Sequence, residues 1–149
     1  MPQSLCKNYI HLVFSTKRRQ NLISEGIQDE FFRYLCGIVN NIGCLAIVAG
    51  GIENHVHILF ELARTMALSV AVKKIKTNSS KWIRSVGGVF DFDWQDGYAA
   101  FSVGQSNVEP VRKYILNQKE HHKDEDYQNE LKRYFQIYKI DYDERYVWD

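Results

Sequence analysis

The segment from His55 to Glu61 carries the feature that most constrains the fold, a strict alternation of side chains. One side holds His55, His57, Leu59 and Glu61, and the other holds Val56, Ile58 and Phe60. A period of two is typical of a half-buried β-strand. Residues two apart leave the same face of a strand, with Cα atoms about 7 Å apart. We therefore expect a strand that presents both imidazoles to one metal ion or one phosphate. Ordinary structural hydrogen bonds are the alternative for such a pair.

The apolar pattern on either side of this segment predicts a series of strands and helices. Strands are expected at residues 9–15, 44–49, 55–61 and 98–103. Helices are expected at residues 24–41, 67–86, 106 to beyond 118, and 126–138. Ser106 and Glu109 have the spacing of a capping box for the third helix. Asp96–Gly97, between two aromatic-rich runs, indicates a hairpin-like turn.

The order of these elements predicts an α+β fold. A βαββαβ series makes a ferredoxin- or RRM-like antiparallel sheet with helices on one face, here followed by C-terminal helices. The other face of the sheet, or the seam between helices and sheet beside the histidines, is expected to remain free for a ligand.

Length and composition fit one domain that spans residues 1–149. Hydrophobic residues make up 45% and charged residues 25%, a balance that argues against a disordered chain. The sequence has neither an apolar run of the roughly 20 residues that cross a bilayer nor a signal-peptide pattern. Cys6, Cys36 and Cys44 show no Cys-x-x-Cys spacing, so reduced thiols are expected. We predict a cytoplasmic protein without membrane contact.

The net charge of +1 conceals an uneven distribution of charge. Residues 1–90 contain 11 basic and 5 acidic side chains, whereas residues 91–149 contain 8 basic and 13 acidic ones. A basic half indicates a polyanionic partner, although mutual neutralisation on the folded surface is the alternative. The residues expected to contact nucleic-acid phosphates are Lys17, Arg18, Arg19, Lys73, Lys74, Lys76, Asn78, Ser79 and Lys81.

Tyr114 and Gln118 lie four residues apart on the third predicted helix, and hence on one face of it. Histidine nitrogens and an amide oxygen from His55, His57 and Gln118 suit a divalent metal such as Mg²⁺ or Mn²⁺. Three protein ligands leave positions open for substrate oxygens. A tyrosine one turn from such a ligand can present its phenol to a phosphate, and a phenol that attacks phosphate yields a covalent phosphotyrosine.

The other histidines and tyrosines are expected to have different roles. His11 is interpreted as a structural residue of the first strand, and His121 and His122 as surface residues near a helix end. Five further tyrosines lack a glutamine four residues on and are expected to pack or stack; they are Tyr127, Tyr134, Tyr138, Tyr142 and Tyr146.

These motifs resemble the single-tyrosine transposases of bacterial insertion sequences, which belong to the HUH endonuclease superfamily. The family's histidine pair matches His55-Val56-His57, and its Tyr-x-x-x-Gln pattern matches Tyr114 and Gln118. The resemblance extends to the segments at residues 11–17, 78–82, 94–103 and 142–149, and so covers nearly the whole chain.

The resemblance implies a metal-dependent DNA transposase. Such enzymes cut single-stranded DNA near hairpins at the ends of their element and rejoin it through a 5′-phosphotyrosine, here on Tyr114, with His55, His57 and Gln118 as metal ligands. They act as homodimers, often with the tyrosine helix of one subunit completing the site of the other. The resemblance leaves undetermined the target and hairpin sequences, the assembly of the site in cis or in trans, and the metal used in the cell.

Two other functions compete with this interpretation. A domesticated transposase would bind DNA hairpins without cleaving them. A replication initiator or relaxase would use the same histidine motif, but the short chain, the single matching tyrosine and the lack of a helicase region argue against it.

Overall fold

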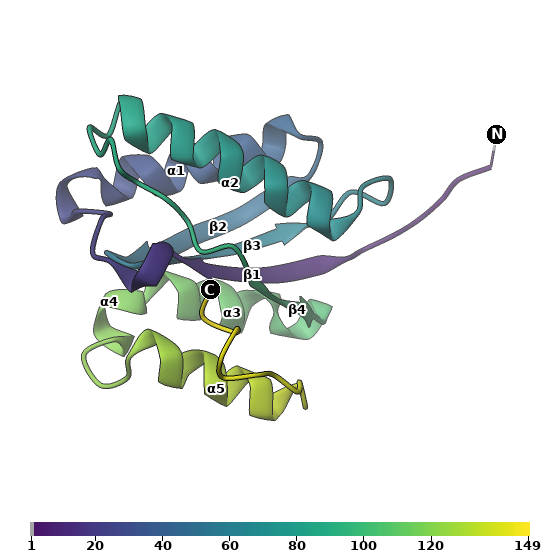
Figure 1. The fold of residues 1–149 in the computed structure, drawn as a ribbon. Coiled ribbons are helices and arrows are strands. Elements are labelled where there is room, and N and C mark those ends of the chain that lie inside the picture. The colour runs from purple at the N-terminus through teal and green to yellow at the C-terminus, as the bar shows by residue number, and fades with distance from the viewer. Residues whose placement is uncertain (1) are drawn as a thin grey trace.

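The computed structural model describes residues 2–149 and contains a four-stranded antiparallel sheet in the order β2-β3-β1-β4. The strands are β1 (Tyr9–Ser15), β2 (Leu45–Ile52), β3 (His55–Glu61) and β4 (Ala99–Val103). Helices cover both faces of this sheet, as Figure 1 shows. The α+β fold with a βαββαβ core and C-terminal helices is therefore confirmed. None of the helices within residues 2–149 has the length and apolar character of a membrane span.

The alternation in β3 has the predicted effect on the two faces of the sheet. Val56, Ile58 and Phe60 are fully buried in the core on one face, and His55 and His57 leave the other. β3 pairs with β1 along its whole length, with His55 opposite Ser15 and β2 on its other side. Helices pack against both sides of β3, so the prediction of a half-buried strand was wrong: both faces of β3 are buried.

The helices α1 (Glu25–Asn41) and α2 (Leu68–Ser85) cover the face that carries Val56, Ile58 and Phe60. Their apolar stripes, which include Phe31, Leu35, Ile75 and Ile83, pack against the strands. Trp94 closes this core and donates a hydrogen bond from Nε1 to the Ser79 hydroxyl over 3.0 Å. The two predicted helices are confirmed.

The C-terminal helices cover the opposite face, which we had expected to be a possible open ligand surface. They are α3 (Val108–Leu116), α4 (Gln118–His121) and α5 (Tyr127–Ile137). Ile115 packs on Leu59 and Val103, whereas Leu131 and Phe135 pack with Val13 and Phe101. In Figure 1 these helices lie below the sheet, opposite α1 and α2. The expected free space is thus reduced to the seam between sheet and helices, where the histidines lie.

Two local predictions were wrong. Residues 90–93 form no strand, and Trp94 makes only an isolated bridge to Thr16, so no hairpin precedes β4. The capping box is absent because a 3₁₀ turn at Gln105–Asn107 precedes α3, and Asn107 rather than Ser106 is its N-cap. Glu109 pairs instead with Arg112, and Nη2 of Arg112 lies 2.8 Å from Oε1 of Glu109.

Gly50 in β2 allows α3 to approach the sheet closely. A Cβ atom at this position would lie 2.6 Å from the carbonyl oxygen of Ile115 and 3.0 Å from its side chain. No such contact would form at Gly37 of α1, where no heavy atom lies within 4 Å. Only a residue without Cβ therefore lets the helix with Tyr114 rest against β2.

We expect Gly50→Ala to lower the free energy of unfolding by about 1–3 kcal/mol, because it overpacks the contact between α3 and β2. Gly37→Ala is the matched control, and it should raise stability by about 0.4–1 kcal/mol by restricting the unfolded chain. Urea unfolding of both variants measures the difference. Equal stability of Gly50→Ala and the unmodified protein would contradict the close approach.

Candidate active site

The histidine pair of β3 lies under the C-terminal helices, and both side chains are fully buried. Nδ1 of His55 lies 2.8 Å from the side-chain oxygen of Asn54, which orients the ring. Nδ1 of His57 lies 2.7 Å from Nε2 of His11, which lies on the adjacent strand β1 opposite Leu59. His11 is therefore a structural residue of the first strand, as predicted, and it holds one of the two candidate ligands. In both rings Nε2 remains directed toward the helices.

Gln118 and Tyr114 reach this site from the C-terminal helices. Gln118 is buried, and its Oε1 lies 3.1 Å from Nε2 of His55. The Tyr114 ring centroid lies 5.9 Å from that of His57. The two residues share a face as predicted but not one uninterrupted helix, because Asn117, with φ −100° and ψ 22°, separates α3 from α4. All four predicted chemical residues therefore meet within one chain.

Glu130 of α5 is a buried carboxylate that the sequence analysis missed. Its Oε1 lies 3.0 Å from Nε2 of His57 and 3.5 Å from Nε2 of His55. It also accepts hydrogen bonds from the Tyr114 hydroxyl and from Nε2 of Gln118. One sequence signal was available: Glu130 falls between Tyr127 and Leu131 in the apolar stripe of an amphipathic helix, where an acidic residue is unusual.

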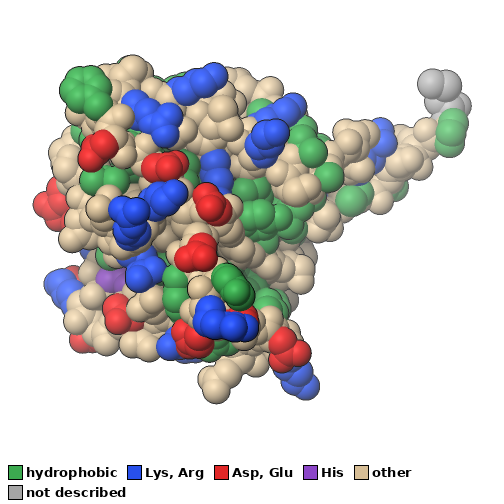
Figure 2. Space-filling model, in the orientation of Figure 1, with side chains coloured by type: hydrophobic (Ala, Val, Ile, Leu, Met, Phe, Trp, Pro, Cys, Tyr) green, Lys and Arg blue, Asp and Glu red, His purple; other side chains and the backbone are tan. Residues whose placement is uncertain are grey.

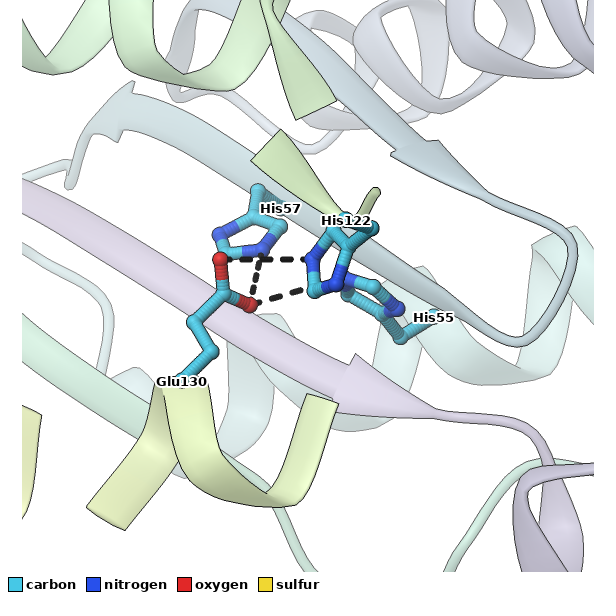
Figure 3. Close-up of side chains that lie close together, drawn as sticks. All are labelled: His55, His57, His122 and Glu130. Atoms are coloured by element: carbon cyan, nitrogen blue, oxygen red, sulfur yellow. Dashed lines mark hydrogen bonds and ion pairs between the residues drawn. The ribbon is translucent and has the colours of Figure 1, made fainter. Parts of the chain in front are cut away.

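His121 and His122 are not the surface residues that we had expected. The His122 side chain is only 5% exposed, and its Nε2 lies 2.8 Å from Oε1 of Gln118 and 3.4 Å from Oε2 of Glu130. Nε2 of His121 lies 3.2 Å from the Tyr114 hydroxyl and 3.0 Å from Glu125. The prediction was wrong because the chain turns back after α4, which brings α5 over the end of that helix. Figure 3 shows His122 and Glu130 directed toward the β3 histidines.

Burial and charge determine the protonation of these groups. Burial lowers the pKa of His55 to about 4, against an opposing interaction with Glu130, so the ring is neutral. Burial alone would raise the pKa of Glu130, but the electrostatic interaction with His57 and the polar contacts with the His122, His55 and His57 rings lower it well below its usual range. Burial and the Glu130 carboxylate raise the pKa of Tyr114, and the charge of Arg133 opposes this increase. Neutral imidazole and ionised carboxylate are the forms that bind metal.

The donor atoms fit a divalent metal ion. His55, His57, His122 and Glu130 each offer an atom within 4.8 Å of all the others. The predicted third ligand, Oε1 of Gln118, lies between two of these imidazoles. The predicted set of His55, His57 and Gln118 can therefore face one ion.

The predicted DNA contacts differ in accessibility. Lys73, Lys74, Asn78 and Lys81 are exposed on α2, and Figure 2 shows several Lys and Arg side chains over this part of the surface. Lys17 and Arg18 are exposed in the 3₁₀ turn Lys17–Arg19, and Arg19 is half-buried beside Trp148. This turn follows β1 directly, at the end of the sheet where Ser15 pairs with His55.

Two of the predicted contacts have structural roles instead. Ser79 is fully buried and accepts the hydrogen bond of Trp94, so it cannot reach DNA in this fold. The Lys76 ammonium donates to the carbonyl oxygens of Gln95, Asp96 and Gly97 at 2.7, 3.1 and 2.6 Å, which uses all three of its N–H groups. Burial lowers the pKa of Lys76 to about 8. Lys76 therefore anchors the loop before β4.

Comparison with known proteins gives the family. Residues 4–118, about three quarters of the chain, match the model of the family described as transposase IS200-like. The chain belongs to this family. No curated protein matches the chain.

Two solved structures share the fold of this IS200-like transposase. A protein of Deinococcus radiodurans R1 that is described as a transposase aligns with a TM-score of 0.62 and 20% identity, covering 79% of this chain and 98% of its own. The REP-associated tyrosine transposase bound to a REP hairpin aligns with a TM-score of 0.57 and 13% identity, covering 82% of this chain and 73% of its own. The IS200-like transposase thus has the fold of transposases with which it shares little sequence.

Lys76→Met should lower the free energy of unfolding of the transposase by roughly 2 kcal/mol, because three carbonyl groups lose a charged donor. Lys73→Met, on the exposed face of the same helix, is the control and should change stability by less than about 0.5 kcal/mol. Guanidinium unfolding compares the two variants. If both behave alike, the structural role of Lys76 is wrong.

Proposed function

We propose that the protein is an HUH-type transposase that cleaves and rejoins single-stranded DNA through Tyr114. The observation that carries the proposal is the convergence of the Tyr114 phenol, the His55–His57 pair and Gln118 on one buried position in one chain. Membership of the IS200-like transposase family supports the same chemistry.

The metal of this reaction would be a divalent ion, Mg²⁺ or Mn²⁺, held by His55, His57 and Gln118. When bound, such an ion neutralises charge on the non-bridging phosphate oxygens and helps to orient the phosphate. Nδ1 of each β3 histidine is held by another side chain, Asn54 for His55 and His11 for His57, so both Nε2 atoms stay directed at the site.

The chain's own residues would carry out the covalent step. The Tyr114 oxygen attacks the phosphorus of a DNA phosphodiester, and the bond from phosphorus to the 3′ oxygen breaks. The products are a 5′-phosphotyrosine and a DNA strand with a free 3′ hydroxyl, which can reverse the step. Glu130, which already accepts the Tyr114 hydrogen bond, would orient the phenol, and the phenolic proton passes to the departing 3′ oxygen. Nη2 of Arg133, 3.1 Å from the same oxygen, would stabilise the phenolate.

The substrate would be single-stranded DNA with a hairpin at each element end. The fold shared with a transposase that was solved on a REP hairpin supports this class of partner. The exposed cations of α2 and the turn at Lys17–Arg19 are the surfaces proposed to contact phosphates. A homodimer would double these contacts. Tyr114 and the histidines lie together within one chain, so each subunit of such a dimer would have a full set of site residues.

Incubating the protein with a single-stranded hairpin oligonucleotide and Mn²⁺ should give a denaturant-resistant protein–DNA adduct. Tyr114→Phe should abolish the adduct, because it removes the attacking oxygen. Tyr138→Phe, at an exposed tyrosine of the C-terminal region, should leave its yield unchanged. An adduct that survives in Tyr114→Phe would disprove the nucleophile. Tight hairpin binding without an adduct under any divalent ion would favour a domesticated binding protein.

Lys73→Gln, Lys74→Gln and Lys81→Gln should each weaken binding of the same oligonucleotide. Each should also reduce the slope of log affinity against log salt by about 0.7, the value for one phosphate contact to a single strand. Fluorescence anisotropy at several salt concentrations measures the slope. Lys132→Gln, on α5, serves as the control for the loss of one positive charge. Slopes equal to that of the control would place these lysines outside the DNA surface.

A further inference from the structure

The site holds more groups able to bind a metal ion than the three ligands named in the proposed function. Beyond His55, His57 and Gln118, the side chains of His122 and Glu130 point into the same buried position (Figure 3). Glu130 is fully buried and His122 nearly so. Neither residue belongs to the histidine pair or the Tyr-x-x-x-Gln pattern, so their place in the site needs its own explanation.

The hydrogen bonds of His122 show which ring nitrogen faces the site with a lone pair. Its Nδ1 lies 2.6 Å from the backbone carbonyl oxygen of Glu125, which can only accept a hydrogen bond, so Nδ1 carries a proton. In the neutral ring Nε2 is then a bare acceptor. This atom lies 2.8 Å from Oε1 of Gln118 and 3.4 Å from Oε2 of Glu130, which are also acceptors.

His55 repeats this arrangement. Its Nδ1 lies 2.8 Å from the side-chain oxygen of Asn54, and its Nε2 faces Oε1 of Gln118 at 3.1 Å and Oε1 of Glu130 at 3.5 Å. The Gln118 amide is oriented by its own donor, because its Nε2 lies 3.3 Å from Glu130. Lone pairs of two imidazoles, an amide oxygen and a carboxylate therefore converge on one position.

Such a convergence needs positive charge at its centre. Protonating both rings would place two imidazolium groups with centroids 4.5 Å apart, with His57 also 5.1 Å from His55, and the one carboxylate balances only one of them. A single cation among the four acceptors satisfies all of them at once. Donor atoms bound at about 2.1 Å to one ion lie about 3.0–3.4 Å apart. Oε1 of Glu130 lies 3.0 Å from Nε2 of His57 and 3.5 Å from Nε2 of His55, and Oε2 of Glu130 lies 3.4 Å from Nε2 of His122.

We propose that His122 and Glu130 are ligands of the same metal ion as His55 and His57, and that this set selects a transition-metal ion such as Mn²⁺, Co²⁺ or Zn²⁺ over Mg²⁺. The inference rests on the proposed function for the identity of the site. Imidazole nitrogen suits these ions, whereas Mg²⁺ requires oxygen ligands and retains its water. The metal then joins β3, the end of α4 and α5. Glu130, which accepts the hydrogen bond of the Tyr114 hydroxyl, is then itself a metal ligand.

Metal binding to the purified full-length protein tests the proposal without any DNA. After removal of metal with a chelator, Co²⁺ is titrated and followed by its visible absorption and by calorimetry. Glu130→Gln and His122→Asn should each weaken Co²⁺ binding at least about tenfold, the smaller end of the loss seen when groups that merely support metal ligands are removed. Both should change the Co²⁺ spectrum. Mg²⁺ in roughly thousandfold excess should not displace Co²⁺ from the unmodified protein.

Glu120→Gln is the matched control, because this exposed glutamate of α4 pairs with Lys123 on the surface. It should bind Co²⁺ as the unmodified protein does. Thermal unfolding without metal identifies any variant that fails to fold, and His122→Asn still tests the proposal if Glu130→Gln unfolds. Unchanged Co²⁺ affinity and spectrum in folded Glu130→Gln and His122→Asn would overturn it, as would displacement by Mg²⁺ or the absence of binding to the unmodified protein.

These results are separable from the test of the proposed function. A Tyr114-dependent adduct together with unchanged metal binding in both variants would leave the transposase mechanism in place and remove Glu130 and His122 from the metal site. Weakened metal binding in both variants with no adduct would support the site and contradict the cleavage reaction.

Discussion

The buried carboxylate of Glu130 is the interaction on which the C-terminal half of the molecule depends. A carboxylate can be removed from water only if other groups satisfy its charge, and here imidazoles, an amide and a phenol converge on it. These partners belong to β3, α3, α4 and the segment after α4. The position of α5 over the sheet and the position of Tyr114 beside the histidines both serve this carboxylate, while Leu131 and Phe135 of α5 pack on the sheet in the same orientation.

The order of strands places this site between two cores. Because β3 lies between β2 and β1, the alternation of its side chains gives one face to the core under α1 and α2 and the other to the C-terminal helices. The histidines are consequently rigid, held by a continuous ladder and by His11. The histidines therefore lie on the sheet, whereas Tyr114 reaches the site from a separate helix.

Much of the fold could be predicted from the sequence, because period-two and helical patterns report directly which side chains are buried. The predictions of DNA contacts failed for polar residues that can either bind phosphate or form hydrogen bonds within the fold. Lys76 and Ser79 look like phosphate contacts in a basic helix, yet they satisfy carbonyl groups and Trp94 within the fold. The sequence does not show whether the ammonium of a lysine in a basic segment faces solvent or the carbonyl groups of a loop. Only the packing of the folded chain distinguishes an exposed lysine from a structural one.

The sequence by itself determined the β3 strand, the histidine pair and the tyrosine and glutamine that accompany it, since each depends on spacing along a single element. Tertiary structure alone decided that Glu130 and His122 complete the site, because the turn after α4 brings α5 back over the histidines. The periodicity of side chains along one helix or strand does not indicate in which direction the chain turns after it. That direction is set by the balance between burying the apolar stripe of α5 and satisfying the carboxylate that interrupts it.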